Sequence, residues 1–132
     1  MVYRYSEIVK KYFKHPKNVG KIKNADAIAT EGSVLCGDMM TMYLKIRNNK
    51  IVDAKFESFG CAANIATASM LTEVVKGMNV DEAEKVEWKD IVKKLGGLPP
   101  IKYHCSILAI QTLRSAIRGW KEKQKKFYNS NS

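Results

Sequence analysis

TMYLKIRNNKIVDAKFE, from Thr41 to Glu57, is the most regularly patterned stretch of this chain. In its first half the apolar residues Met42, Leu44 and Ile46 alternate with polar or exposed ones, and the alternation resumes after Asn48-Asn49. A period of two residues is typical of a strand with one buried face, and the paired asparagines favour a tight turn. The stretch therefore predicts an antiparallel hairpin with one face turned toward a core.

The rest of the chain is expected to complete this hairpin. Two strands alone are marginal in water, so we expect a third strand around Ser33 to Leu35. Apolar residues at helical spacing predict helices over residues 7–13, 64–76, 81–86, 88–95 and 106–126. The consecutive prolines within Leu98–Lys102 predict an extended connection. The order of elements predicts an α+β fold, with a small three-stranded antiparallel sheet covered by helices and a long C-terminal helix.

Length and composition are those of one ordinary globular domain. The 132 residues, of which 45% are hydrophobic and 27% charged, are enough for a single core, so we expect one domain over 1–132 with a frayed tail at about 127–132. No run approaches the ~20 apolar residues of a membrane span, and the N-terminus lacks the apolar region of a secretory signal. We therefore expect a cytoplasmic, reducing location and no membrane partner.

The chain is strongly basic, with a formal net charge of +10. Much of the excess lies in Lys10–Lys23 and Arg114–Lys126. Such a charge attracts acidic partners through long-range steering. We interpret the second run as the solvated side of a helix, and a nucleic-acid partner is not expected.

The three cysteines are the residues most suggestive of chemistry. An odd number cannot pair completely into disulfides, and in a reducing compartment clustered thiols more often bind metal or carry sulfur. Cys36 is followed by Gly37-Asp38, Cys61 follows Gly60 before a helix, and Cys105 follows His104. Because Cys61 and Cys105 adjoin predicted helix starts, we expect both to be nucleophilic thiolates.

Three thiolates with one oxygen or nitrogen donor suit either tetrahedral Zn²⁺ or an iron-sulfur cluster. The fourth donor is Asp38, which adds a negative charge, or neutral His104. Neither holds iron as firmly as a thiolate, so the site is expected to release what it binds. Two other interpretations stay open at this point: a binding module with structural zinc, and a thiol enzyme that uses Cys105 with His104.

Several motifs together resemble a known family. They are Tyr12–Gly20 (YFKHPKNVG), Cys36-Gly37-Asp38, Phe59-Gly60-Cys61, Thr72-Glu73 with Lys76-Gly77, and Leu98–Ser106 (LPPIKYHCS). The chain resembles the U-type iron-sulfur cluster assembly scaffolds, the family of IscU and the N-terminal part of NifU. The presence of His104 and the short spacing before Cys105 resemble the Isc branch rather than the SufU-like branch. Ala62-Ala63-Asn64 departs from the Gly-Ser type of run expected after the second cysteine.

The resemblance implies a scaffold without catalytic turnover of its own. Such a scaffold binds Fe²⁺, builds a labile 2Fe-2S cluster and transfers the cluster to apoproteins, and Zn²⁺ can occupy its site. By resemblance, Cys36, Cys61 and Cys105 are cluster ligands, with Asp38 or His104 in the fourth place. Sulfur would arrive as persulfide from a cysteine desulfurase. Cys105 would be the first acceptor, with Lys102 in support.

The resemblance also implies protein partners. Leu98, Pro99, Pro100, Ile101 and Lys102 match a segment on which an Hsp70-type chaperone docks, although two prolines also make a rigid connector. A ferredoxin would supply electrons, and the family leaves open a homodimer.

Overall fold

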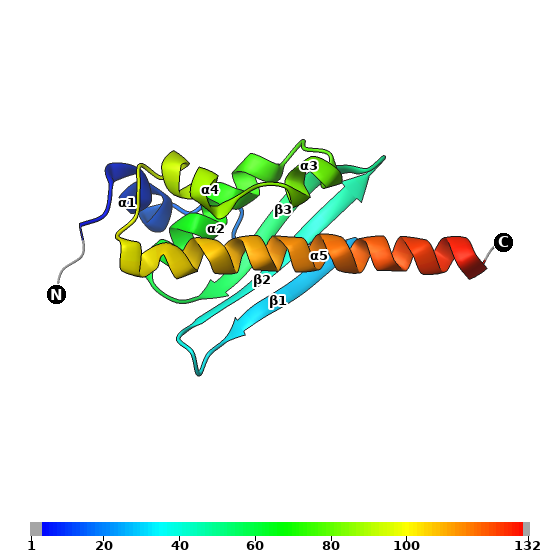
Figure 1. The fold of residues 1–132 in the computed structure, drawn as a ribbon, viewed down its shortest axis with the longest axis horizontal. Coiled ribbons are helices and arrows are strands. Elements are labelled where there is room, and N and C mark those ends of the chain that lie inside the picture. The colour runs from blue at the N-terminus through cyan, green and yellow to red at the C-terminus, as the bar shows by residue number, and fades with distance from the viewer. Residues whose placement is uncertain (1–3, 131–132) are drawn as a thin grey trace.

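The structure is a computed structural model that describes residues 4–130, with side chains described as far as residue 126. It confirms the predicted α+β class: three antiparallel strands, helices over one face and a long C-terminal helix (Figure 1). The elements in order are α1 (Glu7–Lys14), β1 (Ala27–Ser33), β2 (Asp38–Arg47), β3 (Lys50–Phe59), α2 (Ala62–Val75), α3 (Val80–Glu84), α4 (Trp88–Lys94), η1 (Pro100–Lys102) and α5 (Tyr103–Ser130). None of the helices within residues 4–130 combines the length and the apolar character that crossing a membrane requires.

The predicted hairpin is β2 and β3, joined by a turn at Asn48 and Asn49. These residues have φ of 51° and 64°, the left-handed conformation that asparagine tolerates and that tight hairpin turns need. The third strand is β1 rather than Ser33–Leu35, because residues 34–37 form the turn between β1 and β2. The small side chains of β1 give too weak an apolar alternation to mark it as a strand.

The core lies between one face of the sheet and the helices. Met40, Met42 and Leu44 of β2 are fully buried, as is Ile51 of β3. Helices α2 and α5 pack on this face, with α5 running along the sheet and α2 beside it (Figure 1). Most residues of α2 are buried because other helices cover the sides of α2 that the sheet does not. The last strand and the two helices are thereby held in fixed positions relative to one another.

The loop after α1 protects an edge of the sheet. The Phe56 N–H donates to the Asn18 carbonyl at 2.9 Å, and the Gly20 N–H donates to the Phe56 carbonyl at 2.8 Å. The Asn18 side chain donates to Thr72 Oγ1 of α2 at 3.0 Å. This part of the YFKHPKNVG motif therefore covers an otherwise open strand edge and ties it to α2.

The segment before Cys105 differs from the prediction. Residues Pro100–Lys102 form a turn of 3₁₀ helix, in which the Lys102 N–H donates to the Pro99 carbonyl at 2.7 Å. The extended connection was wrong here, because proline at the first position of a helical turn loses no hydrogen bond. Helix α5 consequently begins at Tyr103, and it continues to Ser130 instead of ending near Lys126. Of the predicted frayed tail, 127–130 is helical and 131–132 lie outside the described residues.

Candidate functional site

Side chains from three elements meet at one end of the sheet. Asp38 begins β2, Cys61 caps the start of α2, and Cys105 lies in the first turn of α5. Ligand atoms of these residues all lie within 4.8 Å of one another, and the sulfur atoms of Cys61 and Cys105 are 3.6 Å apart. The tertiary fold therefore brings together two of the three thiols and one of the two predicted fourth donors.

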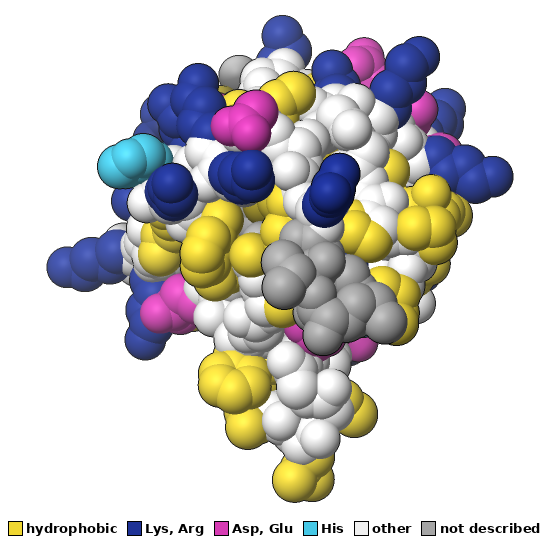
Figure 2. Space-filling model, turned by 90° about the vertical axis from the view of Figure 1, so that its left-hand side faces the viewer, with side chains coloured by type: hydrophobic (Ala, Val, Ile, Leu, Met, Phe, Trp, Pro, Cys, Tyr) yellow, Lys and Arg dark blue, Asp and Glu magenta, His cyan; other side chains and the backbone are white. Residues whose placement is uncertain are grey.

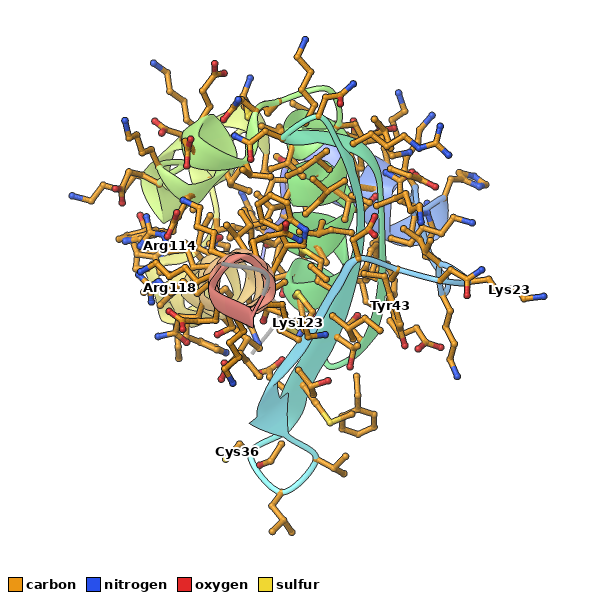
Figure 3. The ribbon with its side chains drawn as sticks, turned by 90° about the vertical axis from the view of Figure 1, so that its right-hand side faces the viewer. Lys23, Cys36, Tyr43, Arg114, Arg118 and Lys123 are labelled. Atoms are coloured by element: carbon orange, nitrogen blue, oxygen red, sulfur yellow. The ribbon has the colours of Figure 1, made fainter. Side chains whose placement is uncertain are left out.

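Cys36 is not part of this group in the described structure. It lies on the exposed turn between β1 and β2, at the projecting end of the sheet (Figure 3). Its N–H donates to Ser33 Oγ at 3.1 Å, which stabilises the turn. Cys36 nevertheless lines the same open hollow, of about 320 Å³, as Asp38 and His104. The expectation that all three thiols converge holds for Cys61 and Cys105 and not for Cys36 in this conformation.

His104 adjoins the group through one ring nitrogen. Its Nε2 lies 3.1 Å from Asp38 Oδ2 and 3.5 Å from the Cys105 sulfur. Its Nδ1 lies 3.0 Å from the Ile101 carbonyl, and a carbonyl can only accept, so Nδ1 carries a proton. A ring that carries its proton on Nδ1 offers the Nε2 lone pair to a metal.

The two contacting thiols share one negative charge. The hydrogen bond from Cys105 lowers the pKa of Cys61 to about 5, with help from the Lys102 charge and the backbone N–H groups of Asn64 and Ala63. The same hydrogen bond to Cys61, together with burial, raises the pKa of Cys105. The two pKa shifts run in opposite directions, and they favour ionisation at Cys61 with Cys105 as the hydrogen-bond donor.

The contact between the two thiols bears differently on each half of the expectation that both are nucleophilic thiolates. Cys61 is partly exposed at the N-cap of α2, where it is both accessible and ionised. Cys105 has no exposed surface and remains protonated beside the Cys61 charge. At Cys105 the neighbouring Cys61 acts against ionisation and the helix start acts for it, so the nucleophilic character of Cys105 stays a prediction.

The pH dependence of alkylation tests this assignment. We expect the rate constant for Cys61 to change little between about pH 6 and 8, whereas an ordinary thiol reacts about tenfold faster per pH unit there. The sign follows from the lowered pKa, since the thiolate already predominates above about pH 5. Iodoacetamide labelling with peptide mass analysis measures Cys61 separately. A tenfold rise per unit at Cys61 would show that the pair is not ionised as described.

The group has dimensions that suit one tetrahedral metal ion. Two thiolates bound to one zinc at about 2.3 Å lie about 3.8 Å apart, close to the observed sulfur–sulfur distance of 3.6 Å. Asp38 adds an oxygen and His104 an imidazole from adjacent positions. The described residues thus offer two sulfur atoms and one oxygen to a single ion without Cys36, with the His104 ring nitrogen 3.1 Å from that carboxylate.

Sequence reasoning did not assign any role to Asn64. Its Nδ2 donates to Asp38 Oδ1 at 3.0 Å from a fully buried position in the first turn of α2. Gly60 makes room for this contact, since a Cβ there would collide with both Asp38 and Asn64. The signal that could have identified Asn64 is its polar side chain, because the residues around it in the sequence are apolar or small.

The surface around the site is apolar with a basic border. Val34 and Leu35 in the turn between β1 and β2 are exposed, as is Phe59 at the end of β3, and Leu35 is 99% exposed. Figure 2 shows hydrophobic side chains on this end of the molecule and on its projecting tip, with Lys and Arg side chains above and beside them. An apolar area with a charged rim is typical of protein docking surfaces.

The predicted docking segment is only partly accessible. Leu98 is buried in the core, whereas Pro100 and Ile101 are exposed, Ile101 by 63%. The segment therefore serves as a connector through Leu98 and exposes only its second half to a partner.

The cations of α5 are less free than the sequence suggested. Arg114 donates to the carbonyls of Glu84 and Val86, and Lys121 pairs with Asp81 and Glu84 (Figure 3 shows Arg114 on α5). These contacts attach α5 to α3 and to the segment that follows it. Arg114 and Lys121 are thus engaged with the fold, whereas Arg118 and residues 122–126 are exposed, as predicted for the solvated side of a helix.

Comparisons with known proteins agree with this geometry. Residues 4–127 match the family model described as the NifU-like N terminal domain. The chain is 51% identical over 113 residues to the iron-sulfur cluster assembly scaffold protein IscU 1 of Archaeoglobus fulgidus, covering 86% of this chain and 74% of the relative. It is 44% identical over 126 residues to the iron-sulfur cluster assembly enzyme IscU of Drosophila melanogaster, covering 92% and 81%. Among solved structures, a candidate SUF-system scaffold protein from Fervidobacterium islandicum AW-1 superposes with a TM-score of 0.71 at 30% identity, covering 86% of this chain and 96% of that one.

Proposed function

This chain belongs to the family of NifU-like N-terminal domains, and we propose that it is a scaffold on which a labile 2Fe-2S cluster is built and from which the cluster passes to apoproteins. The observation that carries the proposal is the convergence of Asp38, Cys61 and Cys105 within 4.8 Å at the partly exposed end of the sheet. The cluster is the cargo of such a protein. The site must therefore bind iron and also release it.

Iron binding is proposed to come first, at Cys61. Its thiolate is ionised and accessible, and Asp38 and His104 lie beside it with an oxygen and a nitrogen. Once iron takes the Cys61 electron pair, the hydrogen bond from Cys105 is lost and the negative charge that raises the pKa of Cys105 is neutralised. The bound cation then favours a Cys105 thiolate, in the same direction as the Lys102 charge.

Sulfur is proposed to arrive at Cys105 as persulfide from a cysteine desulfurase. The Cys105 thiolate attacks the terminal sulfur of the donor's persulfide, the sulfur–sulfur bond of the donor breaks, and the donor cysteine leaves as a thiolate. Cys105 then carries the transferred sulfur next to the bound iron. Electrons that reduce this sulfur to sulfide are proposed to come from a ferredoxin.

Cys36 is proposed to complete the cluster site through movement of the turn between β1 and β2. Gly32 and Gly37 flank this turn with φ of 83° each, a conformation that other residues adopt with strain. The turn already borders the hollow shared with Asp38 and His104. A small movement of this turn would add a third thiolate, which a two-iron core needs and a single ion does not.

The protein is proposed to have no catalytic turnover, because it is consumed as the acceptor and regenerated only when the cluster leaves. The relative from Drosophila melanogaster is named an enzyme and the one from Archaeoglobus fulgidus a scaffold protein. Both names include iron-sulfur cluster assembly. Release is proposed to be promoted by an Hsp70-type chaperone that contacts Pro100 and Ile101, the exposed part of its docking segment.

Anaerobic reconstitution tests the proposed function against a structural zinc module. With Fe²⁺, cysteine, a desulfurase and dithiothreitol as the reductant of persulfide sulfur, we expect acid-labile sulfide, visible absorbance of a 2Fe-2S cluster, and transfer of that cluster to an apo-ferredoxin. Stoichiometric zinc that resists exchange under these conditions would contradict the scaffold role. Zinc in an aerobic preparation would not, since this donor set binds zinc well.

Asp38→Ala is expected to slow cluster transfer to an apo-ferredoxin by about tenfold while assembly falls less, because a carboxylate oxygen holds iron less firmly than a thiolate does. Without the Asp38 oxygen, the cluster is held by ligands that bind iron more firmly, so ligand exchange at iron is slower. Transfer is measured by the circular dichroism of the acceptor. Faster transfer from the Asp38→Ala protein than from the unaltered protein would contradict this role.

A further inference from the structure

We propose that Asn64 is a positioning residue for Asp38, and that its side-chain amide sets how well Asp38 holds a metal and hence how fast the cluster is released. The inference rests on the proposed function, because Asp38 is taken as the exchangeable oxygen donor. It adds a residue that does not itself bind metal.

The first observation is that Asn64 fixes the plane of the Asp38 carboxylate. Asn64 Nδ2 donates to Asp38 Oδ1 at 3.0 Å, while Asp38 Oδ2 faces His104 Nε2 at 3.1 Å. Each carboxylate oxygen therefore has its own partner on a different element. With Oδ1 engaged by the amide, Oδ2 is the oxygen presented to the hollow and to a metal.

The second observation is that the backbone around Asn64 is arranged for this contact. A Cβ at position 60 would collide with both Asp38 Oδ1 and Asn64 Nδ2. Glycine at this position therefore leaves the space in which the Asp38 and Asn64 side chains contact each other. Gly60 thus supports the Asn64–Asp38 contact independently of any positive φ.

The third observation is that packing alone does not explain an asparagine here. Asn64 is fully buried, and its Oδ1 accepts no hydrogen bond from the residues that the structure describes. Alanine is a better helix former and would bury no unpaired acceptor. The amide cannot be turned over, because its oxygen would then face the Asp38 carboxylate. The side chain is therefore explained by the bond to Asp38.

These observations give Asn64 the role that residues behind metal ligands commonly have. A hydrogen bond to the oxygen that does not bind metal orients the carboxylate and restrains its rotation. Without the amide, Asp38 rotates more freely and presents Oδ2 less often. The backbone N–H of Asn64, which helps to lower the pKa of Cys61, is retained in an alanine variant, so this variant isolates the side chain.

The test is a Co²⁺ titration of Asn64→Ala, followed by the thiolate-to-cobalt absorbance. We expect affinity to fall about tenfold, at the low end of the effect of losing a residue that orients a ligand. In an Asp38→Ala background the same substitution is expected to change affinity by less than about twofold, because the amide then has no carboxylate to hold. Thermal unfolding of the metal-free Asn64→Ala protein should occur at the same temperature as in the unaltered protein or higher.

The matched control is Thr67→Ala, one turn further along α2. Thr67 is also buried, and its hydroxyl donates to the Ala63 carbonyl at 2.6 Å instead of to a side chain of the proposed metal ligands. We expect this variant to bind Co²⁺ normally. For the cluster itself, Asn64→Ala should slow transfer to an apo-ferredoxin by a few fold, in the same direction as Asp38→Ala.

Three results would overturn the inference. One is unchanged Co²⁺ affinity in Asn64→Ala, and the second is an equal loss of affinity with and without Asp38. The third is a fall in unfolding temperature, or failure to fold, which would make the role of Asn64 structural. Failure of the unaltered protein to assemble a cluster would instead defeat the proposed function, and the cobalt titrations would still decide the role of Asn64.

Discussion

Cys36→Ser is expected to bind one Zn²⁺ ion within about threefold of the affinity of the unaltered protein, yet to retain less than about a tenth of its 2Fe-2S cluster. The reason is that a single ion finds its donors in Asp38, Cys61, Cys105 and His104, none of which depends on the turn at residues 34–37. A two-iron core spans more space and needs a third thiolate. Zinc competition with a chromophoric chelator and anaerobic cluster yield measure the two properties on the same protein.

Cys61→Ser provides the matched comparison for this result. It removes a thiolate from the described group, so both zinc affinity and cluster yield should fall together. If Cys36→Ser lost zinc as severely as Cys61→Ser, the turn would already be closed over the ion and Cys36 would belong to the mononuclear site. If Cys36→Ser kept its cluster, Cys36 would not be a ligand at all.

Sulfur acceptance at Cys105 is expected to depend on iron. Without metal, Cys105 is buried and protonated, so persulfide labelling there should be suppressed at least about tenfold relative to the Fe²⁺-loaded protein. Fe²⁺ bound at Cys61 removes the charge that keeps Cys105 protonated. Incubation with a sulfur-loaded desulfurase, followed by peptide mass analysis with and without Fe²⁺, measures the difference.

Two variants make this second prediction specific. Cys105→Ser should lose the iron-dependent label, and undiminished labelling of that protein would count against Cys105 as acceptor. In Cys61→Ser no neighbouring thiolate raises the pKa of Cys105, so the label should depend much less on iron. Equal labelling of Cys105 with and without Fe²⁺ in the unaltered protein would refute iron-first order.

The parts of the fold that the sequence predicted are those whose pattern is local. Strict alternation identified β2 and β3, and helical periodicity with Gly77 identified α2. Strand β1 was misplaced because its small residues carry little alternation, whereas Val34 and Leu35, which look like strand residues, are exposed in a turn. The helical turn at Pro100 was not predicted, because proline is compatible with the first turn of a helix as well as with an extended chain.

The site was also predicted only in part. Residue types and their positions at element junctions pointed correctly to the contact between Cys61 and Cys105 and to the nearby Asp38. Which thiol is ionised depends on a contact between residues far apart in sequence, so no local pattern could assign it. The separation of Cys36 and the contact from Asn64 to Asp38 likewise depend on tertiary structure.

The central claim is that the donors at this end of the sheet hold a 2Fe-2S cluster built from iron and sulfide. Mössbauer spectroscopy on protein reconstituted anaerobically with ⁵⁷Fe²⁺, cysteine, a desulfurase and dithiothreitol as the reductant tests it most directly. The account predicts paired high-spin ferric sites of a diamagnetic 2Fe-2S cluster, accompanied by an equal amount of acid-labile sulfide, and their loss in Cys61→Ser. Only mononuclear ferrous iron, with no labile sulfide, would contradict it.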